Sequence, residues 1–389
     1  MASLKIGQWG RSKMTRPKER RSMENKLENI EAIMCLMMIT IANIVLTSSR
    51  ILIKSTGSAS LLNAIYISLV AIILTVILCL LSKQFIGKGL LDISEFLGKK
   101  PLKIIISFSY VAYFLLQIGL FLKKMADALQ IIYYPLTHIV FIIALFCIAC
   151  GIIASLGNNS LFKTMVLLVP FLYLAVILIF MGNSKNFTFR NIYPLLGNGV
   201  QATFLGGLSN IFSFTGLIYL LFLPPKLKHP EKITKIGLIF ITFAGIYLLF
   251  CIASIIFLFG NVLNHADLPP LYLSVRYIEF GTFFQRLDAA FIFICVLGFI
   301  CALNINLFFT LDILKQTLNL SSNKPLIAPC LLASLAIALS IKKNSTLDFL
   351  EDNASKILYI IFAIAIPLLI LIAGIIKKKV TGGDYEKST

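Results

Sequence analysis

The stretch that decides the fold is the apolar segment 199–222, which reads GVQATFLGGLSNIFSFTGLIYLLF. A helix of about 20 apolar residues crosses the hydrocarbon core of a bilayer, so this segment is long enough to span it. Its middle is nevertheless a poor membrane helix, because glycine destabilises a helix interior by about 1 kcal/mol relative to alanine. The small and polar residues at that depth are Gly206, Gly207, Ser209, Asn210, Ser213, Thr215 and Gly216.

Irregular backbone survives in a membrane only where protein buries it or where it lines a polar cavity. In transporter-like folds, such discontinuous helices hold the binding site for a small molecule near the midplane. The composition therefore predicts that this segment is a broken helix at a binding site. A simple packed span is the alternative interpretation, because small residues also allow helices to approach closely.

The whole chain has the composition of a polytopic helical membrane protein. It is 58% hydrophobic and 13% charged, with a mean hydropathy of +0.92 over 389 residues, which is unlike a soluble domain. The sequence predicts an all-α protein with ten transmembrane helices and no accompanying soluble domain. The predicted spans are 32–53, 61–81, 102–122, 136–155, 164–181, 199–222, 236–259, 286–310, 326–341 and 357–376.

The net charge of +18 is explained by membrane topology. If both termini are cytoplasmic, 24 of the 35 Lys and Arg residues fall on the inner side and 11 on the outer side. This asymmetry follows the positive-inside rule, so nucleic acid is not an expected partner, whereas membrane lipid is. The predicted domains are a basic, disordered cytoplasmic segment 1–29, a transmembrane domain 30–378 and a cytoplasmic tail 379–389.

The first predicted span is also irregular at its centre, where Thr40, Ala42 and Asn43 lie. An asparagine at bilayer depth needs a hydrogen-bond partner or a polar cavity. Two interrupted helices five spans apart are typical of two inverted five-helix repeats, with a binding site where the breaks meet. We therefore expect interruptions near 42–45 and 207–215, lying side by side.

Two further spans contribute candidate site residues. Tyr110, Tyr113 and Gln117 follow i, i+3 and i+7 spacing and lie on one helical face. Each tyrosine could equally serve only to bond neighbouring helices. In the eighth span, Cys301 and Asn304 lie deep, and Asn306 projects from roughly the opposite side to Asn304. We expect Cys301 and Asn304 to face the site.

The sequence contains no phosphate-binding loop, zinc-protease motif, nucleophile elbow or Cys/His metal spacing. We therefore expect no enzyme activity, no cofactor and no metal site. Carboxylates are predicted only near helix ends, and the charges from Lys342 to Lys356 are expected in a last outer loop. Without a formal charge at depth, we expect the ligand to be a neutral small molecule.

Several stretches together resemble the spore germination permeases, a branch of the amino acid/polyamine/organocation superfamily. They are Tyr193-Pro-Leu-Leu-Gly-Asn-Gly199, Phe212-Ser-Phe-Thr-Gly216 and Phe284-Gln-Arg-Leu-Asp288, with the amphipathic loop that ends at Phe96-Leu-Gly98. The resemblance covers about residues 25–378 in order and spacing. It implies a LeuT-like fold whose ligand site lies among the first, third, sixth and eighth helices.

The resemblance also implies a function. It indicates the B subunit of an endospore germinant receptor, which binds a small nutrient germinant, here expected to be a neutral amino acid. The implied partners are the A subunit and the C-subunit lipoprotein, and the implied location is the inner spore membrane. An amino-acid transporter of the same superfamily is the alternative function.

Overall fold

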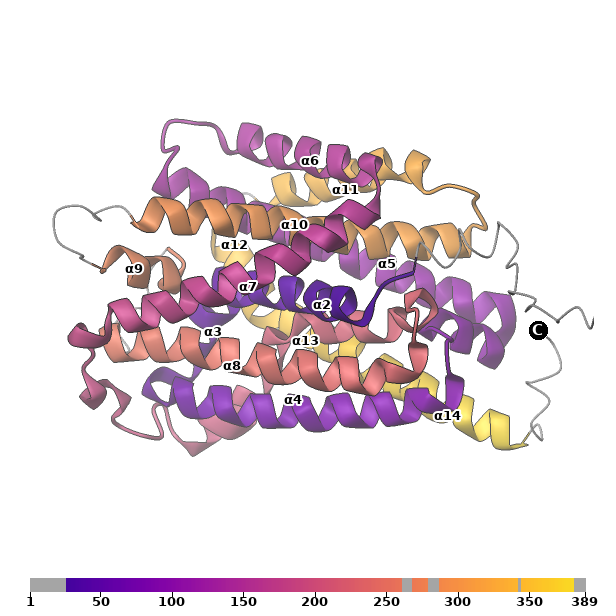
Figure 1. Ribbon diagram of the computed structural model, residues 1–389, viewed down its shortest axis with the longest axis horizontal. Coiled ribbons are helices and arrows are strands. Elements are labelled where there is room, and N and C mark those ends of the chain that lie inside the picture. Colours follow the sequence, from indigo (N-terminus) through magenta and orange to yellow (C-terminus); the bar gives the residue numbers. More distant parts are fainter. Residues whose placement is uncertain (1–25, 261–267, 279–286, 342–343, 381–389) are drawn as a thin grey trace, which may run out of the picture.

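A computed structural model describes residues 26–260, 268–278, 287–341 and 344–380, and the described part is almost entirely helical. Its long helices run roughly along the longest axis of the molecule, with α2 in the middle of the bundle (Figure 1). An isolated bridge joins Leu27 to Leu227. Most of the predicted segments 1–29 and 379–389, and the residues Phe284, Gln285 and Arg286 of the third resembling stretch, lie outside the described residues.

The first predicted span is helical throughout, but it changes its winding where an interruption was expected. It consists of α2 (Asn29–Asn43), the π-helix η1 (Ile44–Ser48) and α3 (Ser49–Thr56). The backbone does not unwind at residues 42–45, since Asn43 and Ile44 keep right-handed helical angles. The expected break is thus a local widening of the helix, a feature often found at functional sites.

The sixth predicted span is broken, as predicted. It consists of η6 (Gln201–Leu205, a π-helix) and the 3-10 helices η7 (Gly206–Ser213) and η8 (Thr215–Phe222). Phe214 between them leaves the helical region at φ −93° and ψ 52°, and the two halves are bent by 54°. The break falls inside the predicted range 207–215.

The chain enters and leaves these two spans through defined turns. After α3, the short η2 (Gly57–Ala59) begins at Gly57, whose φ of 63° suits a residue without a side chain. α5 (Leu90–Ile132) contains a kink at Gly98 and Lys99. Its first two turns are therefore set off from the span, as expected for the amphipathic loop segment.

The other elements complete the bundle. They are α4 (Ser60–Ser82), η3 (Lys83–Phe85), α6 (Ile139–Leu156), α7 (Asn158–Gly182), η4 (Ser184–Asn186), η5 (Phe189–Ile192), η9 (Pro224–Lys226), η10 (Pro230–Lys232), α8 (Ile233–Phe259), α9 (Pro270–Arg276), α10 (Leu287–Thr317), α11 (Lys324–Ser340), α12 (Asn344–Phe349), η12 (Leu350–Ser355), α13 (Lys356–Ile360), η13 (Ile361–Ala365) and α14 (Ile366–Val380).

Seven helices in the described residues are long and apolar enough to cross a membrane, or eight if the bent pair counts as one span. The predicted number of ten is not reached by this count. It would require dividing the 57-residue stretch 29–85 at Gly57 and including the 17-residue α11. The all-helical, multi-span architecture is clear, and the number ten stays a prediction.

The core of the bundle surrounds α2, most of whose residues are buried. α2 packs against α7, α8, α10 and η8, while α5 packs against α10, α11 and α14. The two irregular spans therefore lie at the centre, where neighbouring protein can satisfy their backbone groups.

Candidate functional site

The break in the sixth span lies directly against the first span. The Gly216 amide donates to Thr40 Oγ1 at 3.0 Å, and Asn43 Nδ2 donates to the Phe212 carbonyl at 3.1 Å. The Thr40 hydroxyl itself donates to the Leu36 carbonyl at 3.0 Å. The two irregular stretches are thus side by side, as predicted, and side chains of α2 bond backbone groups that the break frees.

A helix from the far end of the chain completes this bonding. The Tyr359 hydroxyl on α13 donates to the carbonyl of Phe214, the pivot of the break, at 2.8 Å. Tyr359 is buried. The same carbonyl also accepts from the Leu217 amide at 3.0 Å, so Tyr359 supplies a second bond at the pivot. Unpaired backbone groups are costly inside a membrane, and the side chains of Asn43, Thr40 and Tyr359 each bond a backbone group at the break.

Two small cavities adjoin the break, each of about 30 Å³. They share five lining residues, which we call the central cavity residues: Asn43, Tyr113, Gln117, Phe121 and Thr215. One cavity extends to Thr47, Glu351, Ser355 and Tyr359. The other extends to Tyr219 and Asn306.

The volume of each cavity limits what it can hold in this conformation. A space of about 10–15 Å³ or more holds a water molecule, so a cavity of about 30 Å³ is too small for an amino acid. The lining combines amide and hydroxyl groups with aromatic rings, the mixture found in small-molecule sites. In this structure both cavities are therefore closed to a molecule of that size.

Four of the predicted site residues, Asn43, Tyr113, Gln117 and Thr215, line these cavities. Three others form the framework behind them, namely Thr40 and Gly216 in the interhelical bond and Ala42 buried on α2. Ser213 also lies at the break, and its hydroxyl is buried without a hydrogen-bond partner.

Three other predicted residues, Tyr110 on α5 and Cys301 and Asn304 on α10, do not line either cavity. The Tyr110 hydroxyl bonds the Phe362 carbonyl at 2.7 Å, and its ring packs against Phe222 and Phe362, so it belongs to the helix packing. Cys301 is buried, and Asn304 Nδ2 bonds the Ile300 carbonyl within α10. On α10 the asparagine that lines a cavity is Asn306, which projects from the opposite side of the helix to Asn304.

Four more predicted site residues lie on η7, the part of the sixth span that packs against α3 and α4. They are Gly206, Gly207, Ser209 and Asn210. Asn210 Nδ2 donates to Ser55 Oγ at 2.9 Å and to Asn63 Oδ1 at 3.0 Å. Asn63 Nδ2 donates in turn to the Thr203 carbonyl at 2.8 Å. These bonds fix the first half of the broken helix to its neighbours, away from the central cavity residues.

The structure corrects the expectation that the core lacks an ionisable group. Glu351, which was placed in an outer loop, is buried in η12 and lines one of the two cavities. Its carboxylate pairs with Lys124 of α5. The sequence could have indicated that Glu351 faces the cavity. Glu351, Ser355 and Tyr359 are spaced i, i+4 and i+8, so all three lie on one helical face.

More ion pairs surround this pair at the same end of the bundle. Arg50 pairs with Asp348 at 3.3 Å, and Lys54 pairs with Asp352 at 2.6 Å, so both pairs join α3 to the segment that begins with α12. A cavity of about 40 Å³ lies among Arg50, Lys124, Asp348 and other residues. The Lys124–Glu351 pair therefore stands between this cavity and the central one.

The opposite end of the bundle is held together as well. Lys226 pairs with Asp312 at 2.5 Å, which fastens the turn after the broken helix to α10. Lys228 pairs with Glu28 at 2.9 Å beside the Leu27–Leu227 bridge. This second connection ties the same turn to the residues that precede α2.

Comparison with known proteins identifies the class of fold first. The chain is similar to a Na⁺-coupled sialic acid symporter solved in a substrate-bound outward-open state, with a TM-score of 0.61 and 12% identity over 92% of this chain and 90% of that one. The chain therefore has a LeuT-like fold, as predicted, whereas the predicted number of ten helices is not confirmed.

The chain belongs to the spore germination family. The family described as "Spore germination protein" matches residues 26–346. Spore germination protein KB of Bacillus subtilis (strain 168) is 23% identical over 296 residues, covering 73% of this chain and 78% of that protein. Spore germination protein XB of Bacillus anthracis is 22% identical over 216 residues, covering 56% and 61%. The chain is thus an integral, multi-pass membrane protein of this family.

Proposed function

We propose that this protein is the membrane subunit of a spore germinant receptor and that it binds a small nutrient germinant, an amino acid, beside the broken sixth span. The observation that supports this most is the meeting of the break at Phe214 with Asn43 and Thr40, next to a polar and aromatic cavity. Family membership supports the role in germination, and the fold supports the position of the site.

Binding exchanges one set of hydrogen bonds for another. The backbone groups at the break are bonded by Asn43, Thr40 and Tyr359 in the closed pocket. A zwitterion that enters would take over some of these bonds, because its carboxylate accepts from amides and its ammonium donates to carbonyls. A ligand shifts an equilibrium only by its differential affinity for two states, and this exchange supplies the difference.

The lining of the cavity bears on which amino acid binds. Tyr113, Phe121 and Tyr359 offer aromatic surface to an apolar side chain. Glu351 adds a formal charge that was not expected, but Lys124 balances it. We therefore keep the proposal of a neutral amino acid, and we assign Glu351 and Lys124 to the wall of the pocket.

Entry requires part of the protein to move. The 40 Å³ cavity and the Lys124–Glu351 pair lie on the line from the α3–α12 end of the bundle to the central cavity residues. By the positive-inside rule this end faces outward, with both termini in the cytoplasm. Parting of the Arg50–Asp348 and Lys124–Glu351 pairs would open that route.

The proposed receptor contains further subunits in the inner spore membrane. An A subunit and a C-subunit lipoprotein are the expected partners. The turn after the broken helix is a candidate for relaying the bound state, because it joins η8 to α8. Lys226 and Lys228 in this turn already pair with Asp312 and Glu28, so a partner would meet the exposed Lys232 more readily.

Spores that carry substituted subunits at normal levels test the proposal. Replacing Tyr113 with leucine, or Gln117 with leucine, should weaken ion release triggered by single amino acids, whereas Tyr193→Leu on the exposed connection should leave it unchanged. The same response for all three variants would refute the site. A stronger response to glutamate or lysine than to neutral amino acids would refute the ligand class.

Amino-acid transport is the second candidate function, because the fold matches a symporter. Uptake of a labelled amino acid into vesicles that contain the purified chain distinguishes the two functions. Uptake that exceeds the level of a Gln117→Leu variant would favour transport, and binding without uptake would favour the receptor.

A further inference from the structure

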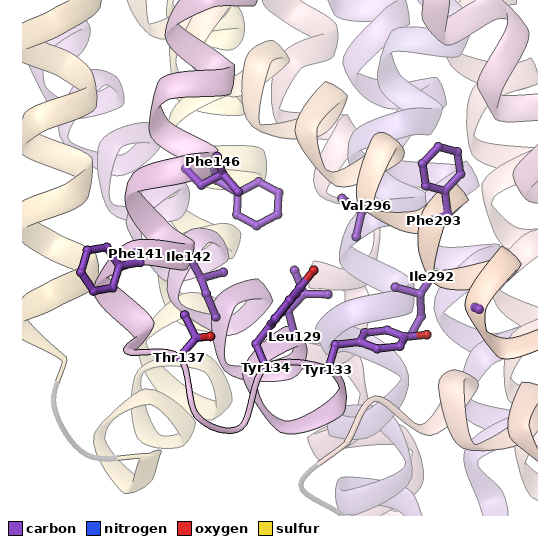
Figure 2. A pocket seen from close by; sticks show the side chains of 12 residues that line it. Leu129, Tyr133, Tyr134, Thr137, Phe141, Ile142, Phe146, Ile292, Phe293 and Val296 are labelled. Carbon is purple, nitrogen blue, oxygen red and sulfur yellow. The ribbon is translucent and has the colours of Figure 1, made fainter.

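A much larger cavity lies away from the proposed germinant site, between the end of α5, the beginning of α6 and the beginning of α10 (Figure 2). Its volume is about 580 Å³, which falls in the range of about 300–1,000 Å³ that is typical of small-molecule sites. The central cavity residues do not contribute to it. It therefore needs an explanation of its own.

The cavity is polar at one end and apolar along its length. Thr137, Tyr133 and Tyr134 lie next to the turn between α5 and α6, whereas Phe146 and Val296 lie at the other end (Figure 2). Apart from the three hydroxyl-bearing residues, the lining is aliphatic, aromatic or alanine. An occupant with a polar end and a long apolar remainder matches this gradient.

Depth in the membrane strengthens this match. The turn between α5 and α6 joins two apolar spans and so lies near a membrane surface, as does the charged Asp288 at the start of α10. Val296 is two turns further along α10, about 12 Å deeper at 1.5 Å per residue. Since half of the hydrocarbon core measures about 15 Å, the cavity has the depth of one leaflet.

The cavity is also open to the surface that faces lipid. Its rim residues Phe141, Leu145 and Phe293 are 68%, 65% and 66% exposed, whereas Phe146 inside it is 5% exposed. In a membrane protein, such exposed apolar side chains meet acyl chains. An acyl chain can therefore enter sideways between α6 and α10 without any change in the helices.

We propose that this cavity is a binding site for one acyl chain of a bilayer phospholipid, whose polar region lies beside Tyr133, Tyr134 and Thr137. The chain lies between the α5–α6 pair and α10. Both α5 and α10 also carry residues of the germinant site, Tyr113 and Asn306 among them. A lipid bound here therefore contacts two helices that also line the proposed pocket.

Fluorescence quenching tests this proposal, since Trp9 is the only tryptophan of the chain. In a Trp9→Phe background, Phe146→Trp places a reporter inside the cavity, and Leu178→Trp places a control on the exposed face of α7. The purified full chain in detergent is titrated with phosphatidylcholine that carries brominated acyl chains. The Phe146→Trp signal should quench and saturate near equimolar lipid, whereas the control should quench only as lipid accumulates in the micelle.

A second variant separates a specific site from general lipid contact. Val296→Phe in the Phe146→Trp protein adds bulk at the deep end of the cavity and should raise the lipid concentration at which quenching saturates, while leaving the elution volume of the protein unchanged. Unbrominated phosphatidylcholine should compete in the parent protein. Identical, non-saturable quenching at both tryptophans would overturn the proposal, and so would a saturable phase that Val296→Phe leaves unchanged. These outcomes do not depend on whether the central cavity binds a germinant.

Discussion

Gly216 packs so closely against α2 that a single added methyl group should force the two irregular spans apart. A Cβ atom at this position would lie 2.5 Å from the Leu36 carbonyl oxygen, 2.7 Å from Thr40 Oγ1 and 2.8 Å from Phe240 Cζ. The Leu36 carbonyl oxygen, the nearest of the three, belongs to the backbone of α2 and cannot rotate away. Gly216→Ala should therefore displace η8 and break the bond from the Gly216 amide to Thr40.

The expected cost follows from these contacts. Overpacking of a close-packed site costs about 1–3 kcal/mol, and loss of a hydrogen bond adds about 0.5–1.5 kcal/mol. Gly216→Ala should thus destabilise the protein by about 2–4 kcal/mol. The nearest atom to a Cβ on Gly206, in contrast, is the Gln201 carbonyl oxygen at 3.8 Å, so Gly206→Ala is a matched control.

Thermal unfolding of the purified variants in detergent measures this difference, and germinant-triggered ion release from spores measures its consequence. We expect Gly216→Ala to lower the unfolding temperature and the response, and Gly206→Ala to preserve both. Gly207→Ala should be intermediate, because its Cβ would meet Asn63 Nδ2 at 2.2 Å and displace a side chain, not backbone, at the loss of the Asn63 bonds to Thr203 and Asn210. Equal behaviour of Gly216→Ala and Gly206→Ala would refute the close contact at the break.

Three further predictions concern side chains around the bundle. Tyr359→Phe removes the hydroxyl that bonds the Phe214 carbonyl and should reduce stability by about 0.5–1.5 kcal/mol, the net contribution of one hydrogen bond, because the carbonyl keeps its bond from the Leu217 amide; unchanged thermal unfolding would contradict this. Arg50→Ala and Asp348→Ala should each raise the accessibility of a cysteine introduced at Gln117 to a water-soluble reagent if their ion pair closes the entry route, and equal labelling of parent and variants would contradict it. The pair of Glu28 and Lys228 lowers the pKa of Glu28 below 4.5, mainly through the hydrogen bond from Lys228, so its contribution is present above pH 4.5 and is lost as the pH falls through the lowered value. The protection of the Leu27 amide, which is its exchange rate relative to the intrinsic rate at the same pH, should then decrease at acid pH in the parent but change less in a Glu28→Gln variant.

Much of the architecture could be predicted because a bilayer restricts what a chain can do. Apolar runs of sufficient length must be helices, and the glycine and polar residues of 199–222 favour a broken span over a regular one. The break at Phe214 accordingly lies where the composition indicated. The same argument predicted that the first span lies beside this break, since Asn43 needs a hydrogen-bond partner inside the membrane. Its side-chain amide donates to the Phe212 carbonyl.

The residues that line the two small cavities were predicted less well than the fold, for geometric reasons. Asn304 and Asn306 are equally polar, and only the rotation of α10 about its axis places Asn306 at the cavity. Tyr110 and Tyr113 share a helical face, yet Tyr110 is one turn away and packs among phenylalanines. Rotation and depth of a helix depend on its neighbours, which a single sequence does not specify.

By itself, the sequence determined that the protein is a helical membrane protein with an irregular sixth span, because transfer free energies and backbone hydrogen bonding act on each segment separately. Only the tertiary structure decided that α2 widens into a π-helix instead of unwinding, that Glu351 is buried against Lys124, and that the pocket is closed. These features depend on contacts between residues as far apart as Lys124 and Glu351, and the energy of such a pair exists only once the fold has brought the two charges together.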